Sequence, residues 1–163
     1  MTLLRVGDHA PDFTAIAHDG RQVSLAGFRG KQVVVLYFYP RDGTSVCTKE
    51  ACGFRDAYQQ FTERGAVVIG VSADPLQRHR AFAASRSLPF VLLSDRDGSL
   101  RRAYGVPNIL CVVPRRVTYV IDKAGVVRHV HSALFSAQQH VTEALAIAGK
   151  LVQEDEHPSV PKP

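Results

Sequence analysis

The sequence lacks any apolar run of the about 18 residues that a membrane-spanning helix needs. Residues 1–8 also lack the basic region and the long apolar core of a signal peptide. We therefore expect a protein outside membranes and located in the cytoplasm. The chain has 163 residues, of which 45% are hydrophobic and 21% charged, a composition typical of one soluble globular domain.

Cysteine is scarce, with three residues at Cys47, Cys52 and Cys111. An odd count in a chain long enough to build its own core argues against a framework of structural disulfides. Cys47 and Cys52 are only five positions apart, which favours redox chemistry or metal binding in a reducing compartment. Cys111 lies in a loop-like stretch, and we interpret it as an incidental thiol.

A large cluster of positive charge is also missing, although the net charge is +5. The basic residues form scattered groups such as Arg101-Arg102 and Arg115-Arg116. No aromatic interleaving and no known binding motif accompany them, as a nucleic-acid site would require. We expect no nucleic-acid partner.

The hydrophobic pattern predicts alternating strands and helices. Apolar runs without alternation are typical of strands buried on both faces, and they occupy 33–39, 67–72 and 90–93. Helical spacing covers 47–64, and Asp74-Pro75 reads as an N-cap and first residue of a second helix reaching about Ser87. Turn signals predict hairpins in 6–25 and 117–130, a short helix follows Asp95, and Ser136 opens the last helix.

This order of elements predicts an α/β fold with a mixed central sheet and helices on both faces, in which the βαβ part is parallel and right-handed. There are no internal repeats and no linker, so we expect one domain over 1–152. The segment 153–163 has three prolines, mixed charges and almost no apolar residues, and we interpret it as a mobile tail.

Cys47 stands just after the first central strand, at the beginning of a helix. Unsatisfied N–H groups and the helix dipole at such a position favour a thiolate over a thiol. The carboxyl end of a central strand is also where open α/β sheets place their sites. The local sequence therefore predicts a redox site at Cys47.

The residues around Cys47 resemble the active-site pattern of the peroxiredoxins. Pro40-Arg-Asp-Gly-Thr-Ser-Val-Cys47 matches proline, three residues, Thr or Ser, two residues, cysteine. The continuation to Asp56 is similar to the peroxiredoxin Q, or bacterioferritin comigratory protein, group, and 116–125 resembles the second family signature. The resemblance covers about residues 4–150 and implies a thioredoxin-like fold. The chain departs from the group at Ser45-Val46, where Pro-Gly is usual.

The resemblance implies a role for each site residue. Cys47 would attack the peroxide as a thiolate, which the helix N-terminus and the permanent cation of Arg116 would stabilise. Thr44 offers a hydroxyl that can accept and donate hydrogen bonds. Pro40 would cover the thiol without competing for hydrogen bonds.

The resemblance also implies that Cys52 condenses with the sulfenic acid of Cys47 to form an intramolecular disulfide. Five residues along an ideal helix put the two Cα atoms about 8 to 9 Å apart, with the side chains rotated about 140° from each other. The limit for a disulfide is about 7 Å. The first turns of the helix must therefore unwind before the disulfide can form.

We expect a monomeric enzyme that reduces hydrogen peroxide and organic hydroperoxides, needs no cofactor or metal, and is recycled by thioredoxin or a similar dithiol reductant. A thioredoxin-like dithiol oxidoreductase is one alternative, but it would have Cys-x-x-Cys. A metal-binding or interaction module is a second, since His129 and His131 share a strand face, although two histidines fall short of a structural zinc site. A peroxide sensor with the same Cys47 chemistry is a third.

Overall fold

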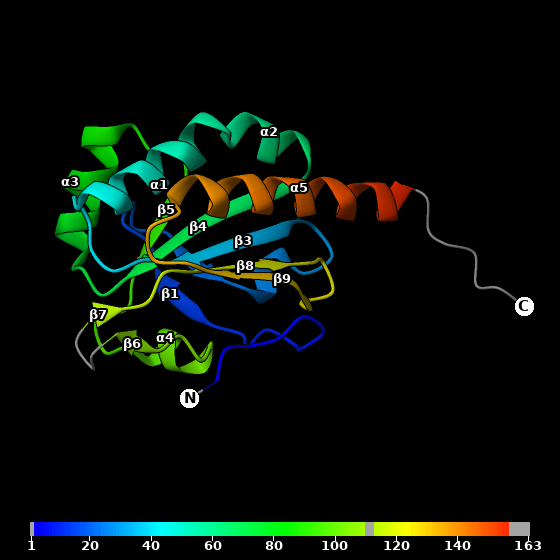
Figure 1. Cartoon of the computed structure of the whole chain (residues 1–163), viewed down its shortest axis with the longest axis horizontal. Coiled ribbons are helices and arrows are strands. Elements are labelled where there is room, and N and C mark those ends of the chain that lie inside the picture. The colour runs from blue at the N-terminus through cyan, green and yellow to red at the C-terminus, as the bar shows by residue number, and fades with distance from the viewer. Residues whose placement is uncertain (1, 110–112, 157–163) are drawn as a thin grey trace, which may run out of the picture.

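The structure is a computed structural model that describes residues 2–109 and 113–156. A five-stranded mixed sheet forms its centre, in the order β5-β4-β3-β8-β9 (Figure 1). The strands are β3 (Val33–Phe38), β4 (Ala66–Ser72), β5 (Val91–Ser94), β8 (Val117–Ile121) and β9 (Val127–Ser132). β3, β4 and β5 are parallel, and β8 pairs antiparallel with both β3 and β9.

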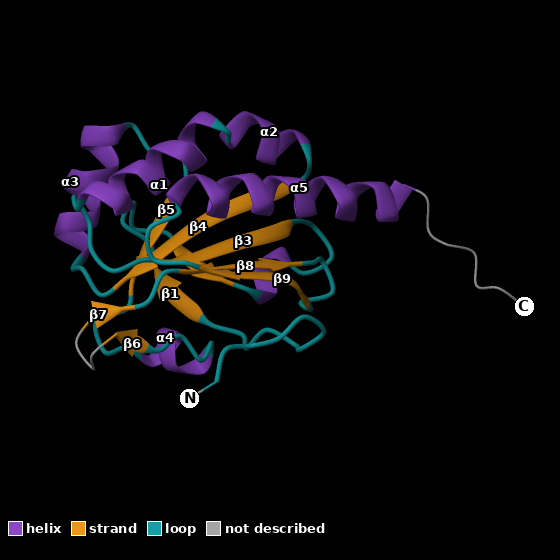
Figure 2. Cartoon of the chain, in the orientation of Figure 1, coloured by secondary structure: helices purple, strands orange, loops and turns teal. Residues whose placement is uncertain are grey.

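Helices lie on both faces of this sheet (Figure 2). One face is covered by α1 (Ser45–Asp56), α2 (Tyr58–Glu63), α3 (Leu76–Arg86) and α5 (Ala137–Glu156). The other face carries α4 (Ser99–Ala103), a 3-10 turn (Ala26–Phe28) and the hairpin of β1 (Thr14–Ile16) and β2 (Gln22–Ser24). A small ribbon joins β6 (Asn108–Ile109) to β7 (Val113–Pro114). The predicted α/β fold, with its mixed sheet and helices on both faces, is confirmed.

The central strand β3 supplies side chains to both hydrophobic cores. All six of its residues are buried, and successive residues such as Tyr37 and Phe38 pack on opposite faces of the sheet. Tyr37 lies so close to Gly70 of β4 that a Cβ there would come 2.9 Å from the tyrosine ring. The sheet therefore holds β3 firmly, and the loop after its carboxyl end leads directly to Cys47.

The predicted helix over 47–64 is divided in two. α1 begins at Ser45, and the backbone at Ala57 (φ −92°, ψ 0°) leaves helical geometry before α2 begins at Tyr58. This change of direction turns Phe61 into the core, where its ring centroid is 5.8 Å from that of Phe54. Hydrophobic spacing alone could not reveal this break, because both helices contribute apolar residues at helical intervals.

The expected beginning of the tail at residue 153 was wrong for residues 153–156, because α5 continues to Glu156. Arg128 of β9 donates to Glu154 at 2.8 Å, and Lys123 pairs with Asp155 at 3.0 Å. These ion pairs to the β8–β9 hairpin hold a polar helix end that composition suggested was mobile. The rest of the expected tail, 157–163, lies outside the described residues.

Within the described residues, no helix combines the length and the apolar character needed to cross a membrane.

Candidate active site

Cys47 is the third residue of α1 and is almost completely buried, with 1% of its surface exposed. Thr44 precedes the helix in an extended conformation (φ −73°, ψ 156°) and occupies the N-cap position. Cys47 therefore lies in the first helical turn, where backbone N–H groups have no carbonyl partner within the helix. The predicted place of this thiol, at the start of a helix and beyond the end of β3, is confirmed.

Arg116 reaches this thiol from the residue before β8, the neighbour of β3 in the sheet. Its side chain is 2% exposed, and three of its nitrogens donate to different partners. Nη2 donates to Cys47 Sγ at 3.2 Å, Nη1 to Glu50 Oε2 at 3.1 Å and Nε to the Leu134 carbonyl at 3.0 Å. Burial opposes the charge, but Glu50 and Cys47 outweigh it and raise the pKa of Arg116 above its ordinary value.

Glu50 is a functional candidate that the sequence analysis missed. It follows Cys47 by three residues, so both side chains lie on one face of α1, and it is completely buried. Among the residues that the structure describes, its Oε1 atom has no hydrogen-bond partner. Burial raises the pKa of Glu50 to about 8, and Arg116 opposes this shift only in part. Arg116 thus contacts two acidic groups at once, Glu50 and Cys47.

Cys52 is also in α1 and is half-buried, and both Cys47 and Cys52 are free thiols. The helix is continuous between them, so the ideal-helix separation of about 8 to 9 Å applies to their Cα atoms and exceeds the bridging limit. Two residues later, Phe54 is buried and stacks on Tyr37 of β3, with ring centroids 4.7 Å apart. The helix is therefore fixed to the sheet just beyond Cys52. The third cysteine, Cys111, lies outside the described residues.

Thr44 and Pro40 lie in the loop that joins β3 to α1. The Thr44 hydroxyl donates to the Arg41 carbonyl at 3.0 Å, and its residue is exposed. Pro40 is half-buried and follows the end of β3. The structure thus brings Arg116 into contact with Cys47, and places Thr44 and Pro40 in the segment that leads to this thiol.

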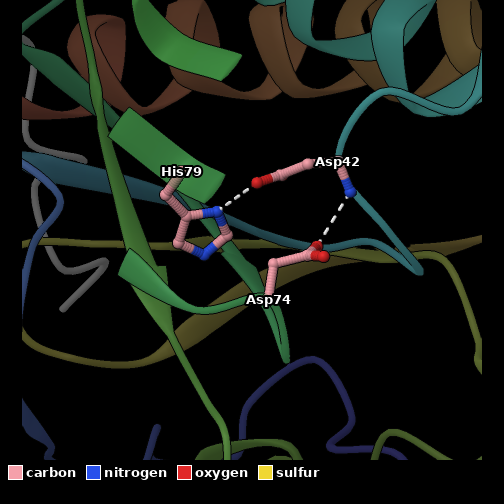
Figure 3. Close-up of side chains that lie close together, drawn as sticks. All are labelled: Asp42, Asp74 and His79. Carbon is pink, nitrogen blue, oxygen red and sulfur yellow. Dashed lines mark hydrogen bonds and ion pairs between the residues drawn. The ribbon is translucent and has the colours of Figure 1, made fainter. Parts of the chain in front are cut away.

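The loop between β3 and α1 is anchored at Asp42 through its contacts with Asp74 and His79 (Figure 3), and the Asp42 side chain is 2% exposed. Its carboxylate accepts from the Tyr39 hydroxyl and lies 2.6 Å from Nδ1 of His79 in α3. Its backbone N–H donates to Asp74 at 2.8 Å. The next residue, Gly43, has a φ of +80°, which glycine adopts at little cost. A fixed residue and a glycine turn therefore precede α1.

Asp74 does not cap α3, as the sequence analysis expected. Pro75 occupies the N-cap position without a side-chain cap. The Asp74 carboxylate instead accepts from the Ser72 hydroxyl at 2.6 Å and from the Asp42 N–H. The N-cap prediction was wrong because the loop before α1, which is distant in sequence, offers this carboxylate a buried donor.

Asp42, Asp74 and His79 are the one group in the described part of the chain whose possible metal-ligand atoms all lie within 4.8 Å of one another. The atoms of this group are already engaged in hydrogen bonds, including the bond between His79 Nε2 and the Leu93 carbonyl at 3.0 Å. We therefore interpret the group as an anchor of the loop.

His129 and His131, which the sequence analysis considered as metal ligands, each approach Glu143 Oε2 of α5 at 2.9 Å. They form no three-ligand group of that kind within residues 2–109 and 113–156. The pair therefore links β9 to α5.

Comparison with known proteins agrees with this geometry. Residues 6–130 match the model of the AhpC/TSA family. The chain belongs to the AhpC/TSA family. A chloroplastic peroxiredoxin Q of Triticum aestivum is 47% identical over 146 residues, which are 89% of this chain and 67% of that protein. A chloroplastic peroxiredoxin Q of Sedum lineare is also 47% identical, over 89% of this chain and 78% of its own length.

Solved structures of peroxiredoxins have the same fold. The peroxidoxin BcpB of Mycobacterium tuberculosis superimposes with a TM-score of 0.84 at 36% identity, covering 91% of this chain and 98% of that one. Peroxiredoxin Q of Xanthomonas campestris gives a TM-score of 0.80 at 26% identity, covering 93% and 98%. The resemblance to the peroxiredoxin Q group is confirmed, and with it the thioredoxin-like fold of a thiol peroxidase family.

Proposed function

We propose that this peroxiredoxin reduces peroxides through Cys47. The thiolate attacks one oxygen of the O–O bond, giving a sulfenic acid on Cys47 and an alkoxide or hydroxide that takes up a proton. The observation that carries the proposal is the contact of 3.2 Å between Arg116 Nη2 and Cys47 Sγ, in a buried site at a helix start. Arg116 stabilises the thiolate, and it also stabilises the charge that develops on the leaving oxygen.

We propose that Thr44 and Pro40 complete the peroxide site. Thr44 hydrogen-bonds the bound peroxide, and Pro40 limits the access of water to the thiolate. Their position in the loop before Cys47 and their match to the family pattern support these roles.

We propose that Cys52 resolves the sulfenic acid as an intramolecular disulfide with Cys47, and that thioredoxin or a similar dithiol reductant reduces this disulfide. Two observations support this cycle: Cys52 is a free thiol in the same helix, and it is more exposed than Cys47. Disulfide formation requires the chain to unwind between about Thr44 and Phe54, because the intact helix holds the two thiols too far apart. We expect a monomer in the cytoplasm.

Hydrogen peroxide and organic hydroperoxides are the proposed substrates. A solved structure of the bacterioferritin comigratory protein of Xanthomonas campestris, 27% identical to this chain, is described in terms of its alkyl peroxide reduction activity. That likeness supports organic hydroperoxides as substrates here.

The variant Cys47→Ser tests the proposal. We expect it to fold but to lose peroxide consumption in an assay with thioredoxin, thioredoxin reductase and NADPH. The matched variant Cys111→Ser changes the third cysteine in the same way and is expected to keep the activity. Peroxide turnover retained by Cys47→Ser would remove Cys47 from the mechanism.

A further inference from the structure

His140 of α5 is a buried histidine outside the predicted site. Its Nε2 lies 2.8 Å from the Ala133 carbonyl, and its Nδ1 lies 2.7 Å from the Thr118 hydroxyl. A carbonyl can only accept a hydrogen bond, so Nε2 carries the hydrogen. Burial lowers the pKa of His140 to about 4, and the bond to Ala133 opposes this only in part. The ring is therefore neutral near pH 7, and Nδ1 accepts from Thr118.

Both hydrogen-bond partners of His140 are close to Arg116 along the chain or through a further hydrogen bond. Thr118 is on β8, two residues after Arg116. Ala133 precedes Leu134, whose carbonyl accepts from Nε of Arg116 at 3.0 Å. α5, which carries His140, packs across β8 and β9 (Figure 1). Three hydrogen bonds and the chain segments between them therefore connect the strand, the helix and the loop after β9 in a closed circuit that includes the Arg116 side chain.

These hydrogen bonds determine the direction in which the Arg116 guanidinium points. This group is planar, so fixing Nε–H also fixes where the two Nη nitrogens point. The bond from Nε to Leu134 thereby directs Nη2 toward Cys47 Sγ and Nη1 toward Glu50. The position of the Leu134 carbonyl depends in turn on its neighbour Ala133, which His140 holds.

We propose that His140 is a positioning residue for Arg116, and that Thr118 acts with it by fixing the tautomer of its ring. His140 holds the loop after β9 so that the Leu134 carbonyl orients the guanidinium toward the thiolate. The inference rests on the proposed function, because it assumes that Arg116 acts on Cys47 in peroxide reduction.

Matched pairs of variants test the inference. Thr118→Val removes the hydroxyl at nearly constant volume, and Thr118→Ser keeps it. His140→Phe removes both hydrogen bonds of the imidazole, and His140→Gln keeps an N–H donor for the Ala133 carbonyl. All are made in a Cys52→Ser, Cys111→Ser background, so that only Cys47 reports. The measurements are the thiolate fraction at pH 7, from absorbance at 240 nm, and the rate of the first oxidation by hydrogen peroxide.

We expect Thr118→Val and His140→Phe each to lower the oxidation rate roughly tenfold, which is less than the ~100-fold that a displacement of 1 Å can cost. The thiolate fraction should fall in the same variants. Thr118→Ser and His140→Gln should stay within about threefold of the parent. The double variant Thr118→Val/His140→Phe should be no slower than His140→Phe, because both changes break the same chain of bonds.

A control separates positioning from general destabilisation. Tyr119→Phe removes a buried hydroxyl from the same strand, β8, where it donates to the Tyr104 carbonyl at 2.7 Å. It should lower the midpoint of thermal unfolding without changing the oxidation rate. The inference is overturned if Thr118→Val oxidises at the parent's rate, or if Tyr119→Phe slows oxidation equally. Should Arg116→Met slow oxidation while Thr118→Val and His140→Phe do not, the proposed function stands and the inference fails.

Discussion

Replacing Arg116 by Met removes a cation that contacts the Cys47 sulfur at 3.2 Å. Two unit charges about 4 Å apart, at an effective dielectric constant of about 20, attract each other by about 4 kcal/mol. Each 1.36 kcal/mol is a factor of about ten in a protonation equilibrium. We therefore expect the ratio of thiolate to thiol at Cys47 to fall by about 100- to 1,000-fold in Arg116→Met.

The rate of the first oxidation should fall further than the thiolate fraction. In the proposed mechanism Arg116 also stabilises the charge on the leaving oxygen, and losing a donor of this kind typically costs about 100- to 1,000-fold in rate. Stopped-flow mixing with hydrogen peroxide gives the rate, and absorbance at 240 nm gives the thiolate fraction. Both are measured in a Cys52→Ser, Cys111→Ser background, so that neither of the other thiols contributes.

Two controls accompany this variant. Arg115 is the neighbouring arginine and is exposed, so Arg115→Met removes the same charge without touching the site and should leave both quantities unchanged. Arg116→Met also leaves the buried Glu50 without its hydrogen-bond donor Arg116. The double variant Arg116→Met/Glu50→Gln removes the carboxylate and so separates this effect from the effect on Cys47. Unchanged thiolate fraction and rate in both Arg116 variants would refute the reasoning. An effect of Arg115→Met instead would assign the role to that arginine.

Three other predictions concern the reaction cycle and the buried carboxyl group. Cys52→Ser should consume about one peroxide per chain and then stop at the sulfenic acid, with sulfinic acid at higher peroxide, as mass spectrometry would detect; a Cys47–Cys111 or interchain link in the oxidised parent would contradict this role. Oxidation should speed amide exchange between about residues 44 and 54 but not in β3; equal protection before and after would exclude unwinding. The folded state holds the Glu50 proton more tightly than the unfolded state, since the pKa of Glu50 rises from 4.5 to about 8. Stability should therefore fall as the pH rises from about 4.5 to about 8, by at most about 1.4 kcal/mol per pH unit, and less steeply in Glu50→Gln; parallel denaturation curves would mean that Glu50 is ionised throughout.

The sequence was sufficient for the parts of the site that depend on local order. Cys47 lies at a helix start because an apolar strand, a short loop and a helical pattern follow one another, and Arg116 was identified through the second signature of the family. Glu50 was missed because a glutamate in a helix is usually solvated, and its burial depends on which face α1 turns toward β8. The spacing of three residues puts Glu50 on the same face of α1 as Cys47, but it does not show that this face is buried against Arg116.

The residues that support the site depend on contacts between distant segments. Asp42 and His79 are 37 positions apart, and Thr118 and His140 are 22 apart. Each pair joins a loop or strand to a helix from another part of the chain, so neither could be found by reading neighbours. The same holds for the end of α5, where ion pairs to the β8–β9 hairpin replace the apolar residues that mark a helix in a sequence.

The first part of α1 lies between two fixed points of the fold. This affects whether Cys52 or a thiol of another molecule reacts first with the oxidised Cys47. Asp42 is bound to α3 and Phe54 is stacked on β3, so the segment between them can unwind only as a short tethered loop. Closing such a loop costs little entropy compared with recruiting a free thiol, and a short tether keeps its ends at an effective concentration in the millimolar range. Under the proposed cycle, we therefore expect Cys52 to react with the oxidised Cys47 as a tethered thiol of the same chain, so that the dithiol reductant meets an intramolecular disulfide.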